Sequence, residues 1–404
     1  MSAVDELRLE AEHHEVSRCR MLVVETGSGL WGAQRYLLRL RPLLEAYGID
    51  QVLAAPRDSA IARAWTADGG QHVHLPSPTD RAVRTAGGRL AIGLAAREFW
   101  RTCRAAQTIR RLSAEVGADV LHANSHWSHL EVALAARMRR VPCVLHLHEE
   151  SEADLLGKLR TLAVLLASRS VAVSEAVTRS LPSSVRHRTT VIRNGVDSQS
   201  LRPAPANHAV RAELAANPEA PVVLTLSRLD PRKGIDHVIR ALAAMPAELS
   251  HVQLAVVGAP ALDPSNGPRL RQLGAELLGD RVRFLGERSD VAELLRAADV
   301  LALASTQEGL PLSILEAHAC GIPVAAYPTA GIPEIISDGV TGLLVRTGDI
   351  GELGRCLQRL LEDTALRARI AAAARARAEG DGDIRVQAAK QASLVRQLVR
   401  RRHH

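Results

Sequence analysis

The sequence has few aromatic residues, no cysteine motif and no long apolar segment. Only 2% of the 404 residues are aromatic. Proteins that bind single-stranded nucleic acid stack its bases on aromatic side chains, so this scarcity argues against that class of protein. The five cysteines are scattered and contain no Cys-x-x-Cys pair, which excludes a disulfide framework and a cysteine zinc site and favours a reducing compartment. No apolar run reaches the ~18 residues of a membrane span, and the charged N-terminus lacks a signal-peptide core. We therefore expect a cytoplasmic location.

The composition is that of a globular protein with a modest positive charge. Apolar residues make up 47% of the chain, and 51 basic residues exceed 44 acidic ones, giving a net charge of +7. This excess fits nucleotide phosphates, an acidic membrane surface or nucleic acid, without choosing among them. Because no nucleic-acid-binding module accompanies the charge, we predict no nucleic-acid partner.

Short β-like runs alternate with helical segments along the whole chain. The predicted strands are CRMLVVET, QVLAA, HVHLP, DVLHA, VPCVLHLH, SVAVS, TTVIRNG, VVLTLSRL, VQLAVVGA, VRFLG, DVLALAS, PVAAY and GLLV. Apolar strands separated by helices indicate parallel sheets covered on both faces. A Pro- and Ala-rich stretch at 201–221 is the candidate linker. We predict two doubly wound α/β domains, 1–200 and 201–379, with a helix at about 380–404 that packs back on the first.

The segment TQEGLPLSILEAHACGIP carries two carboxylates around a predicted helix start. Ligands of open α/β sheets lie beyond the carboxyl ends of the strands, so Glu308 is expected at a ligand-facing edge. Gly309 permits unusual backbone angles, Pro311 suits a first helical turn, and helix N-termini bind phosphate. Glu316 follows on this helix, where a carboxylate can accept both hydrogens of a ribose diol. The alternative is two solvated surface acids.

A basic turn, SRLDPRKG, follows the first strand of the predicted second domain. Arg228 and Lys233 stand five residues apart, across a turn that contains Pro231 and Gly234. Arginine binds a diphosphate with two parallel hydrogen bonds and lysine binds it as a point charge. The alternative is a solvated basic turn without a ligand.

The spacing from Glu308 to Glu316, followed by AHACGIPVAA, resembles the signature of the retaining GT-B glycosyltransferases of family 4. The resemblance implies two facing Rossmann-like domains with parallel sheets, an active site in the cleft between them, and no metal or other cofactor. It implies that Glu308 contacts the donor sugar, that Glu316 contacts the ribose, and that Arg228 and Lys233 replace a metal at the diphosphate. The further donor-binding positions implied are Ser227, Leu285, Gly309, Leu310, Pro311 and Leu312.

Two places in the predicted first domain resemble the family less closely. The loop TGSGLWGAQ has Trp31-Gly32 where the family has a Gly-Gly pair, and Gly32 resembles the residue that faces the donor phosphates. His146 and His148 share one face of the strand VPCVLHLH. The resemblance implies that His148, at the carboxyl end of this strand, contacts the donor sugar. Core histidines are the alternative, more so for His146, and a zinc site lacks a third ligand at suitable spacing.

The segment 88–112 predicts a helix with six arginines and an apolar side. Basic amphipathic helices lie on anionic membranes, and such a contact would suit a lipid-linked acceptor. The alternative is an ordinary helix that covers the sheet and leaves its arginines in water.

Taken together, the sequence predicts a metal-independent, retaining hexosyltransferase. It transfers a sugar from a UDP- or GDP-sugar to a glycan, glycolipid or small-molecule acceptor, as in polysaccharide or glycolipid biosynthesis. The predicted location is the cytoplasm or the inner face of the cell membrane. The alternatives are a nucleotide-sugar epimerase or hydrolase of the same fold and a sugar-nucleotide-binding protein without turnover.

Overall fold

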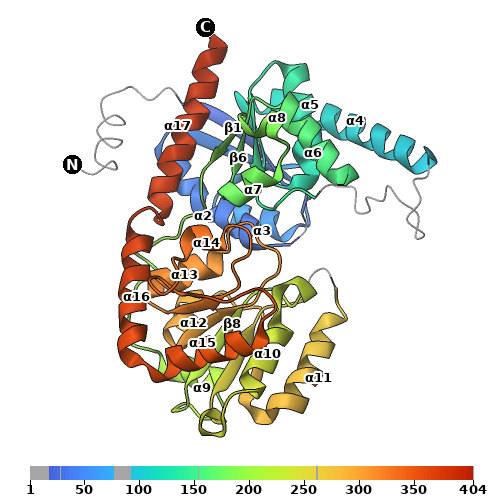
Figure 1. Cartoon of the computed structure of the whole chain (residues 1–404). Helices are drawn as coiled ribbons and strands as arrows, with labels where there is room; N and C mark the ends of the chain where they lie inside the picture. Colours follow the sequence, from blue (N-terminus) through green and yellow to red (C-terminus); the bar gives the residue numbers. More distant parts are fainter. Residues whose placement is uncertain (1–17, 28, 77–91, 153, 261–262, 404) are drawn as a thin grey trace. The chain divides into compact units, whose positions relative to one another are not determined.

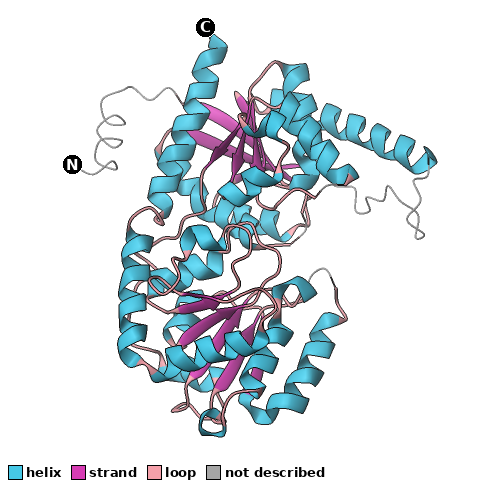
Figure 2. Ribbon diagram, in the orientation of Figure 1, coloured by secondary structure: helices cyan, strands magenta, loops and turns pink. Residues whose placement is uncertain are grey.

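A computed structural model describes residues 18–27, 29–76, 92–152, 154–260 and 263–403. The chain divides into two compact units (Figure 1). Unit 1 contains the described residues up to Arg193 together with those from Arg385 onwards, and unit 2 runs from Asn194 to Ile384. In each unit helices enclose a sheet (Figure 2). No helix among the described residues is long and apolar enough to cross a membrane.

Unit 1 is built on a seven-stranded parallel sheet with the order β3-β2-β1-β4-β5-β6-β7. Its strands are β1 (Cys19–Val24), β2 (Ile49–Ala55), β3 (Gln71–His74), β4 (Val120–Ala123), β5 (Cys143–Leu147), β6 (Arg169–Ala172) and β7 (Thr189–Val191). The order reverses between β1 and β4, which makes their carboxyl ends the switch point of the sheet.

Unit 2 repeats this plan with six parallel strands in the order β10-β9-β8-β11-β12-β13. The strands are β8 (Val222–Leu226), β9 (Gln253–Val257), β10 (Val282–Gly286), β11 (Val300–Leu303), β12 (Val324–Ala326) and β13 (Leu343–Leu344). Here the switch point lies between β8 and β11. Every strand that the sequence predicts is present in one sheet or the other, and the predicted fold class is confirmed.

The helices follow the strands in sequence and cover both faces. Those of unit 1 are α2 (Gly32–Ala46), α3 (Ala60–Ala67), α4 (Ile92–Glu115), α5 (His129–Arg139), α6 (Leu155–Leu166), α7 (Glu175–Ser180), α8 (Ser183–Arg186) and α17 (Ile384–His403). Those of unit 2 are α9 (His208–Leu214), α10 (Ile235–Ala243), α11 (Asn266–Leu278), α12 (Val291–Arg296), α13 (Leu312–Cys320), α14 (Ile332–Ile335), α15 (Ile350–Glu362) and α16 (Thr364–Glu379). Short 3₁₀ turns occur at η1 (His126–Ser128), η2 (Pro231–Lys233), η3 (Ala247–Leu249) and η4 (Gly279–Arg281).

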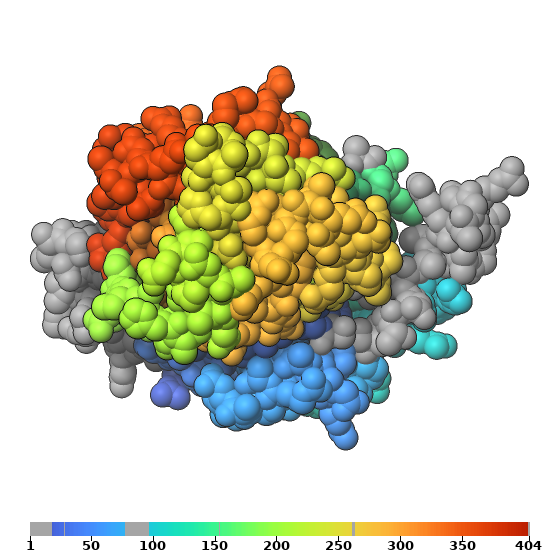
Figure 3. All heavy atoms as spheres, turned by 90° about the horizontal axis from the view of Figure 1, so that it is seen from below, coloured from blue at the N-terminus to red at the C-terminus, as the bar shows by residue number. Residues whose placement is uncertain are grey.

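Apolar side chains of the strands and helices fill the interior of each unit. In unit 2, Val223, Leu254 and Val300 of three neighbouring strands are fully buried against residues of α10 and α15. Side chains of α9 and α11 lie at the surface of this unit (Figure 3). In unit 1, Leu394 and Leu398 of α17 pack against a cluster under β5 to β7. The last helix therefore belongs to the core of unit 1.

The boundary between the units lies at Arg193/Asn194, seven residues before the predicted boundary at 200/201. The stretch 201–221 belongs to unit 2 and contains α9. Asn207 caps this helix, because its side chain accepts from the N–H groups of Ala209 and Val210. A Pro- and Ala-rich composition therefore marks a short capped helix here and not a linker.

Candidate functional site

Two loops of unit 2 meet where β8 and β11 end side by side. Gly234 has a φ of +61°, and a Cβ built on it would lie 2.1 Å from the carbonyl oxygen of Ala304. Only glycine allows this approach without displacing the backbone. The Thr306 N–H donates to the carbonyl oxygen of Arg232 at 2.8 Å. These contacts join the basic turn after β8 to the acidic loop after β11.

Lys233 and Glu308, 75 positions apart in sequence, form an ion pair across this junction. The Lys233 Nζ lies 2.6 Å from the Glu308 Oε1. The side chains are 14% and 11% exposed, so the pair is largely screened from water while remaining at the edge of the unit. Glu308 leaves lysine N–H donors for a further acceptor, because an ammonium group has three. The structure thus brings together one member of each predicted motif.

The neighbouring basic residues are paired as well. The Arg228 Nε lies 2.9 Å from the Oδ2 of Asp230, whose side chain is 1% exposed. The Arg232 Nη1 donates to the Gln307 Oε1 at 2.5 Å. Arg228 is therefore not a freely solvated cation, whereas the alternative interpretation, a solvated basic turn without a ligand, would require it to be one. A buried carboxylate fixes its guanidinium near the carboxyl end of β8.

The acidic loop leads into α13, a helix that is buried over most of its length. Helix α13 begins at Leu312, and Pro311 is its N-cap with extended angles (φ −72°, ψ 125°). The prediction that Pro311 occupies the first turn is wrong by one residue, because its ψ is not helical. The Gly309 carbonyl oxygen accepts from the Gly331 N–H, and the buried Asn194 amide donates to the Leu310 carbonyl at 2.9 Å. The loop before the helix is thus held from two sides.

Glu316 lies on the second turn of α13 and is 5% exposed. A buried glutamate is rare unless it has a partner, which argues against a solvated surface acid at this position.

Ser227 directly follows β8 and Leu285 lies near the carboxyl end of β10, and β9 lies between these two strands. The Ser227 N–H donates to the Val257 carbonyl oxygen at 3.0 Å. In β10, the register with β9 shifts between Phe284 and Gly286. Leu285 is therefore the residue at which the ladder is interrupted, a local irregularity of the kind that often lies near a binding site.

In unit 1, Gly32 is the first residue of α2 and Trp31 is its N-cap. The Trp31 N–H donates to the Gln34 Oε1 at 3.1 Å. A Cβ at Gly29 would lie 2.2 Å from the Trp31 indole nitrogen, so the tryptophan folds over the glycine loop. The tryptophan in place of the family's first glycine thus shapes the loop before α2.

His148 follows β5, and its Nε2 lies 3.1 Å from the Asn124 Oδ1. Its ring stacks on that of His146 at 4.2 Å between centroids, and His146 lies 5.5 Å from His122. Burial lowers the pKa of His148 to about 3 and that of His122 to about 4. It also lowers the pKa of His146 well below its usual value. The three rings are neutral at physiological pH, and His146 belongs to the core, as its alternative interpretation states.

Two buried residues near His148 escaped the sequence analysis. Glu25 is 0% exposed at the end of β1, and Asn124, which follows β4, is 2% exposed. Their side chains are hydrogen-bonded at 2.6 Å. A glutamate directly after a buried strand is the signal that could have pointed to this contact. Within the described ranges, no group of three or more His, Cys, Asp or Glu side chains could hold a metal ion.

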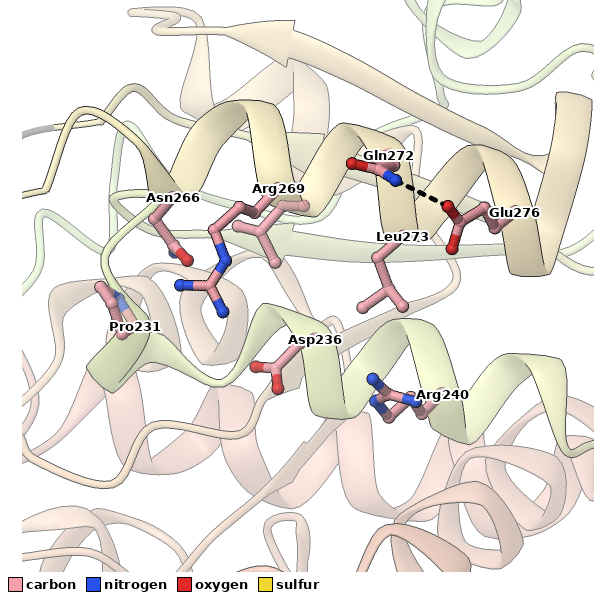
Figure 4. A pocket seen from close by; sticks show the side chains of 9 residues that line it. Pro231, Asp236, Arg240, Asn266, Arg269, Gln272, Leu273 and Glu276 are labelled. Atoms are coloured by element: carbon pink, nitrogen blue, oxygen red, sulfur yellow. Dashed lines mark hydrogen bonds between the residues drawn. The ribbon is translucent and has the colours of Figure 1, made fainter.

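A groove of about 350 Å³ runs along unit 2 between α10 and α11 (Figure 4). Asp236 and Arg240 line it from α10, and Arg269 and Glu276 line it from α11. Charges of both signs face it, and Pro231 of the basic turn is among its lining residues, but none of the predicted donor-binding residues is. The groove therefore borders the basic turn without including the paired charges at the strand ends.

Comparisons with known proteins identify the family of the chain. The model for glycosyl transferases group 1 matches residues 207–377, and that for glycosyltransferase family 4 matches residues 31–200. An alpha-maltose-1-phosphate synthase of Mycobacterium tuberculosis is 31% identical over 290 residues, which cover 65% of this chain and 74% of that protein.

The chain belongs to glycosyltransferase family 4. This family-4 chain is also 33% identical, over 284 residues, to a D-inositol 3-phosphate glycosyltransferase of Stackebrandtia nassauensis. The match covers 63% of this chain and 62% of that relative. The crystal structure of Anabaena Alr3699/HepE in complex with UDP and glucose superposes with a TM-score of 0.78 at 26% identity, covering 94% of this chain and all of that one. The fold is GT-B, and the predicted enzyme class, a glycosyltransferase, is that of the family.

Proposed function

We propose that the chain transfers a hexosyl-type sugar from a UDP- or GDP-sugar to a glycan, glycolipid or small-molecule acceptor, with retention of the anomeric configuration and without a metal. The observation that carries the proposal is the pairing of Lys233 with Glu308 at 2.6 Å, at the carboxyl ends of β8 and β11. In an open α/β sheet this is the place where ligands bind. Two motifs that are separate in sequence thus form one polar site.

In this proposal Lys233 and Arg228 bind the diphosphate of the donor. Their carboxylate partners hold both cations in position before the ligand arrives, so little side-chain entropy is lost on binding. As the bond to the sugar breaks, negative charge grows on the departing diphosphate. Fixed positive charges stabilise that charge without further reorganisation, which is the task that a metal ion performs in other transferases.

The remaining residues of unit 2 bind the other parts of the donor. Glu316 accepts the hydroxyl hydrogens of the ribose, and Glu308 accepts from the sugar. The loop of Gly309 and Leu310 and the N-terminus of α13 face the phosphates, because a helix start presents N–H groups to anions. The backbone at Leu285 contacts the base, and Ser227 is a further contact to the donor.

Unit 1 contributes His148 to the sugar and Gly32 to the phosphates. A side chain placed to attack the sugar as a nucleophile is not among the proposed site residues. We therefore propose substitution on the same face of the sugar, through an ion pair between the departing diphosphate and the sugar cation.

The proposal is tested by nucleotide release from UDP-, GDP- and ADP-sugars in the presence of EDTA, with and without candidate acceptors. The wild type is compared with Glu316→Gln and, as a matched control, Glu362→Gln, which changes an exposed glutamate of α15. We expect release of one nucleotide diphosphate, lost in Glu316→Gln and kept in the control. The anomeric configuration of the product is then determined by NMR.

Each alternative function gives a different result. An epimerase would convert the donor without an acceptor and without net release, and a hydrolase would release free sugar. A binding protein without turnover would bind one donor by calorimetry and release nothing. Neither release nor binding with any donor, or release that EDTA abolishes, would contradict the proposal.

We also propose that unit 1 contacts an anionic phospholipid surface at the inner face of the cell membrane. The N-terminal turns of α4 extend past the neighbouring helices of unit 1 (Figure 1), and they expose Phe99 and Trp100, each 64%. The exposed Arg97 and Arg104 lie on the same helix. Aromatic side chains beside arginines match the headgroup region of an anionic bilayer.

A row of exposed leucines on α6 extends this argument to a second helix, since α5 packs against both α4 and α6. These side chains are Leu156, Leu159, Leu162 and Leu165, which are 37–50% exposed. Further along α4, Ala106 and Ile109 are buried, so the C-terminal half of this helix covers the fold. The sheet-covering interpretation thus holds for one half of α4 and the membrane proposal concerns the other.

Co-sedimentation with vesicles tests the membrane contact. The full chain is mixed with vesicles of phosphatidylcholine alone or of phosphatidylcholine with phosphatidylglycerol. We expect binding only to the anionic vesicles, reduced about tenfold or more in the Phe99→Ser/Trp100→Ser variant. Leu277→Ser, which changes an exposed leucine (38%) on α11 of unit 2, is the control. Equal sedimentation of the wild type with both vesicles, or equal binding by all variants, would contradict the contact.

A further inference from the structure

A buried carboxylate links two parts of the candidate site in unit 1. The Glu25 Oε1 accepts the Gly27 N–H at 2.7 Å, and its Oε2 accepts the Asn124 Nδ2 at 2.6 Å. The Gln34 side chain and the Thr26 backbone also donate to it. The Gln34 amide nitrogen lies next to Gly27, on the side of the Oε1. All the groups around the carboxylate are therefore N–H donors.

This surrounding fixes the amide of Asn124. Burial raises the pKa of Glu25, but four N–H donors surround its two oxygens and favour the form that only accepts hydrogen bonds, so Asn124 turns its NH₂ group toward Glu25. Its Oδ1 then points the other way and lies 3.1 Å from the His148 Nε2. Because an amide oxygen is an acceptor, the hydrogen of this bond belongs to the histidine.

The histidine has one hydrogen to place. Burial, together with the nearby His122, lowers the pKa of His148 to about 3, so the ring is neutral. A neutral imidazole carries its hydrogen on one nitrogen and accepts with the other. The bond to Asn124 thus selects the form with the hydrogen on Nε2 and leaves Nδ1 as an acceptor. The stacking on His146 holds the plane of the ring.

We propose that Glu25 is a positioning residue that acts through Asn124 to hold His148 in its Nε2–H tautomer, with Nδ1 as the acceptor for a hydroxyl of the transferred sugar. The other oxygen of Glu25 holds the Gly27 backbone in the loop before Gly32. One buried carboxylate thus sets both unit 1 contributions to the donor. The role toward the sugar rests on the proposed function, whereas the tautomer does not.

The proposal predicts a specific change of the His148 tautomer when Glu25 is replaced by glutamine. Two donors, Gly27 N–H and the Gln34 amide, lie on the Oε1 side and one, the Asn124 amide, lies on the Oε2 side. The new amide oxygen therefore takes the first position, and its NH₂ faces Asn124. Asn124 must then rotate its oxygen toward residue 25 and its NH₂ toward His148. His148 becomes an acceptor at Nε2, and its hydrogen moves to Nδ1.

The test uses the full chain labelled with ¹⁵N-histidine and long-range ¹H–¹⁵N NMR, which distinguishes the two tautomers. Signals of His148 are assigned by their loss in His148→Gln. We expect Nε2–H in the wild type and in the buried-glutamate control Glu131→Gln, and Nδ1–H in Glu25→Gln. The same tautomer in wild type and Glu25→Gln, or Nδ1–H in the wild type, would overturn the proposal.

Kinetics separate positioning from simple loss of structure. With the donor found in the nucleotide-release assay, Glu25→Gln is expected to lower kcat on the order of 10²-fold with the donor KM little changed. This is less than the roughly 10⁴-fold loss seen where a wrongly oriented histidine is itself the base. If Glu25 acts through Asn124, the double variant Glu25→Gln/Asn124→Ala is no slower than Asn124→Ala alone. Additive losses would contradict the relay.

The two proposals fail in different ways. A wild type with the Nε2–H tautomer that releases no nucleotide from any donor would reject the proposed function and leave the relay standing. If Glu25→Gln does not fold, Asn124→Ala carries the test, because it removes the acceptor at Nε2. We then expect a mixture of both tautomers of His148, and an unchanged pure Nε2–H form would overturn the proposal.

Discussion

The two units hold similar parallel sheets but fix their site residues by different means. In unit 2, charged side chains pair directly at the strand ends, Lys233 with Glu308 and Arg228 with Asp230. In unit 1, the buried Glu25 reaches His148 only through a neutral amide, and the rings behind His148 are neutral too. The difference teaches that one fold can present fixed charge at one switch point and a fixed hydrogen-bond pattern at the other.

The surfaces of the units differ as well. Eight of the ten large apolar side chains that are exposed in the described part of the chain belong to unit 1, and unit 2 has Leu277 and Val340. Unit 1 therefore has the surface for a lipid or protein contact, whereas the polar chemistry of unit 2 is concentrated in two loops. This difference fits the proposed contact of unit 1 with an anionic lipid surface.

The largest effect is expected from removing the charge on the unit 2 side. Lys233→Ala should lower the rate of nucleotide release by about 10²–10³-fold, because a preorganised charge that stabilises the leaving group is lost. Lys390→Ala, an exposed lysine of α17, should stay near the wild-type rate. A rate of nucleotide release for Lys233→Ala within about threefold of wild type would show that this charge does not contribute to the reaction. The proposed contrast, fixed charge in unit 2 against a fixed hydrogen-bond pattern in unit 1, would then be wrong.

The next effect concerns the glycine that brings the two loops of unit 2 together. Gly234→Ala should lower the free energy of unfolding of unit 2 by about 3 kcal/mol, because the new Cβ is both at positive φ and 2.1 Å from a carbonyl oxygen. Gly279→Ala has positive φ with no atom within 4 Å and should cost only about 1–2 kcal/mol. Urea unfolding followed by far-UV circular dichroism measures both.

The tryptophans provide an internal control for this experiment, since all four lie in unit 1. They are Trp31, Trp65, Trp100 and Trp127. Their fluorescence should therefore report an unchanged unfolding transition in both glycine variants. A shift of the tryptophan transition by Gly234→Ala would show that the units unfold together, and equal costs of the two variants would refute the close approach.

The smallest effect concerns acid and unit 1. His122 has a pKa of about 4 in the fold, against 6.5 in the unfolded chain. Above pH 6.5 it is neutral in both states and contributes nothing. Between pH 6.5 and 4 only the unfolded chain binds the proton, so stability falls as the pH drops, by about 2 kcal/mol at pH 5. His122→Phe should therefore lose less stability between pH 8 and 5 than the wild type.

Tryptophan fluorescence in urea measures this difference for unit 1 alone. The raised pKa of Glu25, caused by its burial, acts in the opposite direction, but it is common to both proteins and cancels in the comparison. His251→Phe, a residue that follows η3 in unit 2, is the control and should leave the tryptophan transition unchanged at both pH values. Parallel pH profiles for wild type and His122→Phe would show that the burial of His122 does not lower stability in acid.

Much of the fold could be predicted because its signals are local. Each apolar run between helical segments becomes a parallel strand, as burial on both faces demands. That Lys233 and Glu308 lie close together could be predicted for a similar reason. Each lies in a short motif that follows a strand, and both strands end at the switch point of the sheet. By contrast, α9 was missed because the cap formed by Asn207 was outweighed by the surrounding prolines, and Pro311 was misplaced by one residue because its fixed φ suits the N-cap as well as the first turn.

The sequence by itself determined the strands, the fold class and the motifs from which the enzyme family follows, because periodicity and motif spacing are properties of neighbouring residues. Only the tertiary structure decided the partners of those residues. Glu25 and Asn124 are 99 positions apart, and Asn124 and His148 are 24 apart. No local sequence pattern therefore predicts that Glu25 and His148 both form hydrogen bonds with the side-chain amide of Asn124. Burial then decides the chemistry: it keeps His148 neutral and makes the placement of its one hydrogen depend on a carboxylate it does not touch.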